Sequence, residues 1–162
     1  MSLQSLMRAL FVLAFVSAAS VALAQAPNPY GAPISLESAK KAAAAAFAEA
    51  RKNNWNMAIA VVDGGGDLIY FEKMDATQTG SVNVALAKAR SSAMFKRPTK
   101  VFQDAVAGGG AGLRILGLEG AVPVDGGLPI IMDGKMVGAI GVSGAAGDQD
   151  AMCAKAGVDA LK

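Results

Sequence analysis

The chain of 162 residues contains no histidine. Without an imidazole it cannot supply a Ser-His-Asp triad, a Cys-His pair, a histidine-based zinc site or the common histidine ligand of haem iron. Cysteine occurs once, as Cys153, so that no internal disulfide can form. These absences exclude the most frequent hydrolytic and zinc-dependent enzyme classes, and they leave packing as the source of stability.

Aromatic and charged residues are also few, at 6% and 17% of the chain. The formal net charge is +2, which gives no support for nucleic-acid binding, because such proteins carry a concentrated basic surface. Alanine and glycine dominate instead, and a core of small residues relies on the close approach of backbones. Flat surfaces of small residues also favour self-association, so we expect a homo-oligomer, either a dimer or a larger assembly.

Residues 1–24 are expected to form a cleavable signal peptide. Arg8 precedes an apolar run over 9–24 that ends on the small residues Ala22 and Ala24, a pattern that signal peptidase recognises. The run is shorter than a membrane-spanning helix of about 20 residues, and prolines and a polar residue follow it. We therefore expect cleavage after Ala24, a periplasmic or secreted protein, and no membrane span after processing.

The remainder of the chain is expected to fold as one domain. Residues 25–33 contain three prolines and are predicted to be an extended N-terminal segment. Residues 34–162 are long enough for one core and show no internal repeat. The order of elements in this part predicts an α+β fold, in which helices flank an antiparallel sheet of about five strands.

Hydrophobic periodicity predicts the elements. Helices are expected over 35–53, 81–95, 99–107 and 147–161, and strands over 57–62, 68–73, 128–132 and 136–142, with two short candidates over 113–116 and 122–124. Ser35 is expected to cap the first helix and Thr99 the third. Lys88 is expected to face outward from the second helix, whereas Met152 and Cys153 belong to the apolar stripe of the last.

The strongest local signal is the hairpin over 127–144. Two apolar runs flank Asp133-Gly134, a dipeptide that tolerates positive φ at both centres of a type I′ turn. Gly138, Ala139 and Gly141 alternate with larger apolar residues in the second run, so that another element can approach its backbone closely. We interpret this run as a central strand.

The glycine runs match neither common phosphate-binding motif. Two pairs of aspartates, at 63/67 and 148/150, are explained by turn chemistry and by helix-start chemistry. No metal site is predicted.

One stretch indicates a binding site. An aromatic residue, three cations and a hydroxyl stand at a proline-fixed junction between two helices: Phe95, Lys96, Arg97, Thr99 and Lys100. Arg97 offers a bidentate fork, Lys96 or Lys100 a point charge, and Thr99 short-range donors, a set that suits a carboxylate or a propionate. The alternative is a solvated turn in which Thr99 is only a cap.

Six sequence motifs occur in a fixed order, at 87–90, 95–99, 122–131, 133–144, 148–150 and 154–157. Together they resemble the GlcG/HbpS family of haem-binding proteins and the C-terminal part of PduO-type proteins. The resemblance covers the chain from Ile34 onward. It implies an α+β domain that assembles into dimers and larger homo-oligomers, and it implies binding of haem or another small ligand in some members, with haem-degrading activity sometimes suggested.

Haem bound to this chain would need an oxygen or sulfur ligand, because histidine is absent. Thr99 is the candidate by its place in the motif, and Met94 is a second candidate. Tyr70 and Cys153 are further possibilities, although Met94 is expected to fill the core and Cys153 to be buried and inert.

Three hypotheses follow. The first is an exported protein that binds haem or a related tetrapyrrole through the corner around Arg97 and Thr99. The second is an enzyme or carrier for a small hydroxy- or ketoacid such as glycolate. The third is an oligomeric accessory protein that binds no ligand. Whether the protein is an enzyme stays open.

Overall fold

The computed structural model describes residues 28–162. The predicted signal peptide lies outside the described residues. Within that part of the chain, no helix combines the length and the apolar character that a membrane crossing requires.

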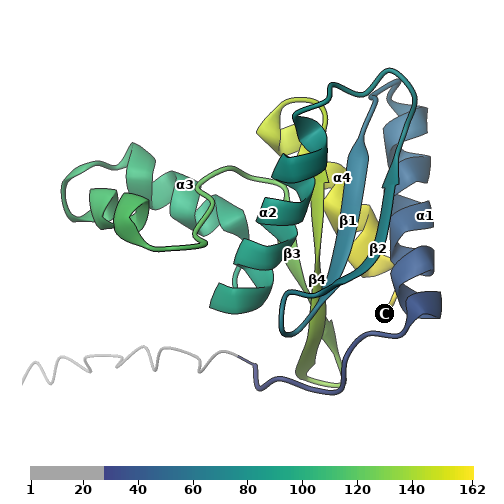
Figure 1. Cartoon of the computed structure of the whole chain (residues 1–162), viewed down its shortest axis with the longest axis horizontal. Coiled ribbons are helices and arrows are strands. Elements are labelled where there is room, and N and C mark those ends of the chain that lie inside the picture. Colours follow the sequence, from purple (N-terminus) through teal and green to yellow (C-terminus); the bar gives the residue numbers. More distant parts are fainter. Residues whose placement is uncertain (1–27) are drawn as a thin grey trace, which may run out of the picture.

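The fold is built on a four-stranded antiparallel sheet with the order β2-β1-β4-β3 (Figure 1). The strands are β1 (Ala58–Asp63), β2 (Leu68–Lys73), β3 (Gly127–Met132) and β4 (Lys135–Ser143). The helices are α1 (Leu36–Lys52), α2 (Ser81–Phe95), α3 (Thr99–Ala107) and α4 (Gly147–Asp159), and a 3₁₀ segment η1 (Gly110–Gly117) follows α3. The predicted α+β class and its single sheet are confirmed.

The two faces of the sheet are covered by different helices (Figure 1). Ile59 and Val61 of β1 pack with α1 and α4, whereas Ala58, Ala60 and Val62 pack with α2. This alternation follows from the two-residue period of a strand. The result is a three-layer body with a core on each side of the sheet.

Close backbone contact sets the spacing of these layers, as the composition predicts. A Cβ atom added to Gly141 of β4 would lie 2.1 Å from the carbonyl oxygen of Ala85 in α2. On the opposite face, a Cβ at Gly157 would lie 2.8 Å from the carbonyl oxygen of Ala42. Neither position has room for a side chain, because real Cβ contacts this short essentially do not occur.

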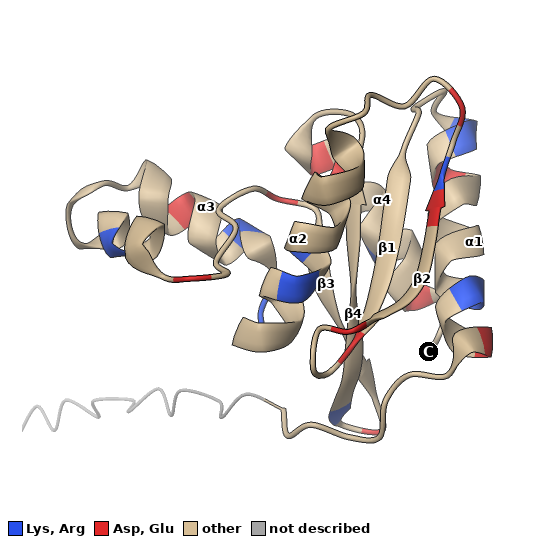
Figure 2. Cartoon of the chain, viewed as in Figure 1, with Lys and Arg blue, Asp and Glu red and all other residues tan. Residues whose placement is uncertain are grey.

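Residues 98–124 form an arm that projects from the body (Figure 1). The arm contains α3 and η1, which pack mainly on each other. Several of its large apolar side chains are exposed: Val101, Leu113, Leu116, Leu118 and Val124. Its ribbon carries charges of both signs (Figure 2).

Residues 28–33, here called the strap, run along the body before α1. The amide of Gly31 donates to the carbonyl oxygen of Met136 at 2.8 Å, and the amide of Met136 donates to the carbonyl oxygen of Pro29 at 2.8 Å. These two bonds fasten the strap beside the start of β4.

The main elements agree with the sequence predictions. Ser35 caps α1, since its side-chain oxygen accepts from the amide of Ser38. Asp133 and Gly134 have φ of 49° and 71°, as the type I′ turn between β3 and β4 requires. β4 has a neighbour on each side and is therefore a central strand.

Four expectations about the elements are wrong, and a fifth, about Met94, concerns the site. The sheet has four strands, because residues 113–116 belong to η1 and residues 122–124 have no strand structure. Lys88 is fully buried, and Met152 is 49% exposed. Thr99 does not cap α3, since Pro98 holds the cap position and no side chain caps this helix.

Candidate functional site

The predicted corner lies where α2 gives way to α3. Lys96 ends α2 in the left-handed conformation, with φ of 53° and ψ of 40°. Ser92 then donates from its hydroxyl to the carbonyl oxygen of Arg97 at 2.9 Å, which holds the bend closed. Pro98 fixes φ at −57° directly before α3. The sequence Lys-Arg-Pro thus forms a compact turn between the helices.

Thr99 lies in the interior and has a structural partner. It is 0% exposed, and its Oγ1 accepts a hydrogen bond from the amide of Gly127 at 2.9 Å. A Cβ at Gly127 would lie 2.6 Å from Thr99 Cγ2, so that the methyl group fills the space above this glycine. Thr99 therefore joins α3 to the edge strand β3 and lines none of the cavities described below.

The three cations of the corner point in different directions. The Lys96 ammonium lies 3.9 Å from the centre of the Tyr30 ring. Arg97 is exposed, its guanidinium lies 5.6 Å from the Phe102 ring, and its Nε donates to the carbonyl oxygen of Phe95. Lys100 pairs with Asp104 at 2.8 Å, and this hydrogen bond raises the pKa of Lys100. The three cations therefore do not converge on one point.

The residues of the corner lie near two different cavities. The first, of about 520 Å³, lies beside the end of α2 and is lined by Tyr30, Gly31, Pro33, Asp63, Gly64, Gly65 and Met94. We call it the Met94 cavity. The second, of about 500 Å³, lies between the start of α3, the edge strand β3 and α4, and it includes Pro98 and Lys100. Lys96 contacts the ring of Tyr30, which lines the first cavity, and Lys100 lines the second.

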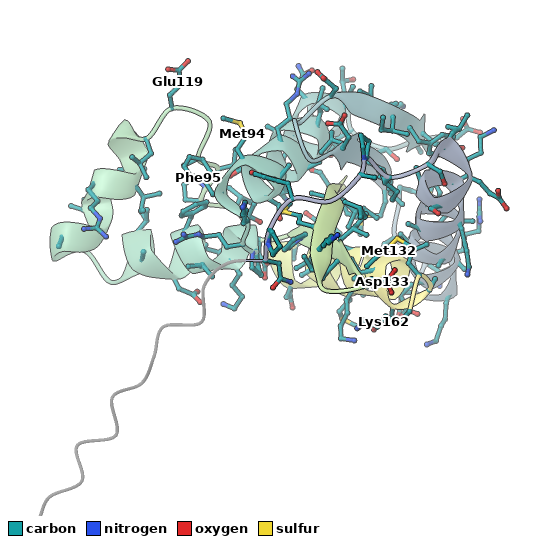
Figure 3. The ribbon with its side chains drawn as sticks, turned by 90° about the horizontal axis from the view of Figure 1, so that it is seen from below. Met94, Phe95, Glu119, Met132, Asp133 and Lys162 are labelled. Carbon is teal, nitrogen blue, oxygen red and sulfur yellow. The ribbon has the colours of Figure 1, made fainter. Side chains whose placement is uncertain are left out.

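Met94 is 51% exposed, so the expectation that it fills the core is wrong. It lies at the base of the arm next to Phe95 (Figure 3). Its terminal methyl and sulfur lie within 3.4 Å of the position that a Cβ would take at Gly120, so the arm closes one side of this methionine. The thioether thus stands between the arm and the Met94 cavity.

Tyr30 was not among the predicted site residues. Its hydroxyl donates to the carbonyl oxygen of Ala93 at 2.9 Å, and its ring makes a cation–π contact with the Lys96 ammonium. The chain has two tyrosines, and this one stands in a proline-rich segment that is otherwise polar or small. An aromatic residue in such a segment is the signal that could have identified it.

A second polar centre is buried in the body. Lys88 Nζ donates to Asp150 Oδ2 at 2.7 Å and to the carbonyl oxygen of Val142 at 3.0 Å. The other carboxylate oxygen accepts from the amide of Ala145 at 3.1 Å. Burial raises the pKa of Asp150 more than the hydrogen bond from Lys88 lowers it. This ion pair ties α2 to β4 and to the first turn of α4, which lacks a side-chain cap.

The remaining candidate ligands are poorly suited to bind a metal. Cys153 is fully buried, as expected, and burial raises the pKa of its thiol to about 11. The Tyr70 hydroxyl donates to Glu72 at 2.5 Å, and this bond raises the pKa of the phenol. Among residues 28–162, no group of three or more histidine, cysteine, aspartate or glutamate side chains could hold a metal ion.

Comparison with known proteins places the chain. The family model described as haem degrading protein HbpS-like matches residues 34–159. Protein GlcG of Escherichia coli K12 is 38% identical over 110 residues, which are 68% of this chain and 81% of GlcG. The crystal structure of a double mutant of HbpS from Streptomyces reticuli matches with a TM-score of 0.74 at 31% identity, over 82% of this chain and 89% of that one.

The crystal structure of a PduOC:heme complex matches with a TM-score of 0.72 over 80% of this chain and 96% of that one. Its sequence identity is 24%, so this likeness concerns the fold alone. The resemblance seen in the motifs is confirmed by the matched family model, by the identity to GlcG and by the HbpS structure. The chain belongs to the HbpS-like family, within the group that also includes GlcG.

Proposed function

We propose that this protein binds haem or a related tetrapyrrole in the Met94 cavity. The observation that carries the proposal is the thioether of Met94, half exposed at a cavity of about 520 Å³, with the Lys96 ammonium 3.9 Å from the centre of the Tyr30 ring that lines this cavity. The cavity volume lies in the range of small-molecule sites. The family description and the heme complex of a protein with the same fold support the choice of ligand.

The residues around the cavity fit such a ligand in three respects. A thioether is an accepted axial ligand of haem iron, and Met94 offers one at this place without a histidine. Tyr30 adds one aromatic ring to the lining. Lys96 supplies a cation for a propionate, and the exposed Arg97 stands one residue further along the chain.

Met94 replaces Thr99 here as the first candidate for the axial ligand of the haem iron. The Thr99 hydroxyl is enclosed and accepts from the amide of Gly127, so that binding iron there would require the chain to open between α3 and β3. Met94 needs no such opening, since half of its surface is already exposed.

A titration with hemin tests the proposal. The purified protein is expected to give a saturable shift of the Soret band, and Met94→Leu is expected to lower the affinity at least about 10-fold, which corresponds to about 1.4 kcal/mol. Leucine keeps the volume and removes the sulfur. Met152→Leu is the matched control, because Met152 is also half exposed but lies on α4.

Two outcomes count against the proposal. A wild-type titration with no saturable shift overturns haem binding. A wild-type shift that is the same in Met94→Leu as in Met152→Leu overturns the role of the thioether.

The alternative of a small hydroxy- or ketoacid has less support. Such a ligand depends on converging cations, and here Lys100 pairs with Asp104 while Arg97 lies over Phe102. Thermal shifts with glycolate, lactate and glyoxylate provide the comparison. A stabilisation by these acids that exceeds the one by hemin would reverse the ranking.

We further propose that the chain is exported, with cleavage after Ala24, and that it self-associates through the arm. The leader pattern over 1–24 supports the first statement. The exposed apolar side chains of the arm support the second. The mass and the N-terminal sequence of protein recovered from the periplasm or the medium test the cleavage.

A further inference from the structure

The strap is fixed more firmly than an extended segment ahead of a domain needs to be. Its backbone makes two hydrogen bonds to Met136, and the Tyr30 hydroxyl donates to the carbonyl oxygen of Ala93 at 2.9 Å. The hydrogen bond from Tyr30 reaches the last turn of α2, because Ala93 directly precedes Met94. The strap therefore bridges β4 and the end of α2.

The Tyr30 ring has a neighbour on α2 and another on the first hairpin. The Lys96 ammonium lies 3.9 Å from the ring centre. A Cβ at Gly64 would lie 3.1 Å from Tyr30 Cδ1, so that the hairpin approaches the ring as closely as a glycine allows. A cation held over an aromatic face is attracted by the negative charge of that face. The ring thus restrains the position of the Lys96 head group.

The strap also limits the cavity. Gly31 and Pro33 line the Met94 cavity and also line a third cavity of about 460 Å³, which lies toward Met132 and Asp133 at the tip of the second hairpin. The strap is therefore a wall that the two cavities share.

We propose that Tyr30 is a positioning residue of the ligand site, which holds the Lys96 ammonium at the rim of the Met94 cavity and so makes the site selective for tetrapyrroles with free carboxylates. The inference rests on the proposed function and deepens it. Tyr30 acts through Lys96, because the ring is the contact that orients this long side chain. A fixed ammonium loses less side-chain entropy when it meets a carboxylate than a mobile one does.

The test compares hemin with its dimethyl ester, which lacks free propionates. In the wild-type protein we expect hemin to bind about 10-fold more tightly than the ester, a ratio that corresponds to about 1.4 kcal/mol. Tyr30→Leu and Lys96→Gln are each expected to reduce this ratio several-fold. Tyr30→Phe keeps the ring and is expected to retain most of the selectivity.

A double-mutant cycle separates positioning from a merely structural role. If Tyr30 acts through Lys96, then Tyr30→Leu in the Lys96→Gln background lowers the selectivity no further, since the interaction is already absent. Nuclear magnetic resonance gives a readout without ligand. The ε-methylene protons of Lys96 are expected to be shifted upfield by the Tyr30 ring in the wild type and in Tyr30→Phe, and to lose this shift in Tyr30→Leu.

The outcomes distinguish the two claims. No saturable binding of either porphyrin to the wild type overturns the proposed function, and the inference falls with it. Binding to the wild type with equal affinity for acid and ester, or with additive effects of the two substitutions, overturns the role of Tyr30 alone. An unshifted Lys96 resonance in the wild type also overturns it.

Discussion

The body and the arm of this protein differ in how densely they expose large apolar side chains. In the body, even a lysine is buried, and its charge is matched by Asp150 at 2.7 Å. In the arm, several leucines face the solvent, and Leu116 is 66% exposed. The arm therefore concentrates exposed apolar side chains within a short segment, and such a patch is typical of a surface that binds a partner.

Met94 lies where the two regions meet. It stands near the end of α2, and a Cβ added at Gly120 of the arm would lie 3.4 Å from its sulfur. The residues that line the Met94 cavity all belong to the body, so a ligand there would contact the body and would come near the arm only beside Met94. Substitutions in each region should show how much the body and the arm each contribute to stability. The effects on stability should decrease from the body to the arm.

The largest effect is expected for the buried ion pair. Asp150→Asn leaves the Lys88 ammonium without a charged partner in a place where both side chains are at most 3% exposed. Breaking a buried pair in this way costs about 3–5 kcal/mol. The free energy of unfolding in urea measures the loss, and Asp148→Asn is the matched control, because Asp148 is an exposed acid in the same first turn of α4.

The double variant Lys88→Met/Asp150→Leu sharpens this test. It removes both charges together, and replacing a buried pair by apolar residues is often neutral or stabilising. We expect it to regain much of the stability that Asp150→Asn loses. A variant Asp150→Asn as stable as Asp148→Asn would show that the pair contributes nothing to the body.

A smaller effect is expected at the joint between the body and the arm. Thr99→Val keeps the shape of the side chain but leaves the buried amide of Gly127 without an acceptor. An unsatisfied buried donor costs about 1–3 kcal/mol. The shift of the urea midpoint measures this loss, with Thr79→Val, which alters an exposed threonine, as the control. Equal midpoints for the two variants would mean that Thr99 does not hold the joint.

The sequence predicted the elements that local patterns determine. Ser35 as a cap, the turn at Asp133-Gly134 and the helix over 81–95 all depend on residues close together in the chain, and each is present. The two short strands were wrong: residues 113–116 belong to η1, and residues 122–124 form an irregular segment, because a few apolar residues do not by themselves determine a strand. Nothing in a single segment shows whether a neighbouring strand exists to pair with it.

The site was predicted less completely, since it depends on contacts between distant segments. Lys88 was expected to face the solvent because it is charged. Its buried partner Asp150 stands 62 positions away in the sequence, and hydrophobic periodicity cannot reveal a pair of that kind. Tyr30 reaches Ala93 across 63 positions. The Phe-Lys-Arg-Pro-Thr motif located the correct corner, but it could not show that Thr99 turns inward while Met94 turns outward.

The smallest effect on stability is expected in the arm itself, where a substitution should change assembly instead. Leu116→Lys places a charge on a side chain that is already 66% exposed, so the free energy of unfolding should change by no more than about 0.5 kcal/mol. If the arm joins copies of the chain, this lysine must be desolvated in the interface, and light scattering should show a lower mass than for the wild type. Leu36→Lys is the matched control, because Leu36 is also an exposed leucine but stands at the start of α1. A wild-type protein that is monomeric, or an equal mass for both variants, would leave the exposed leucines of the arm without a role in self-association and would make the contrast with the body a matter of packing alone.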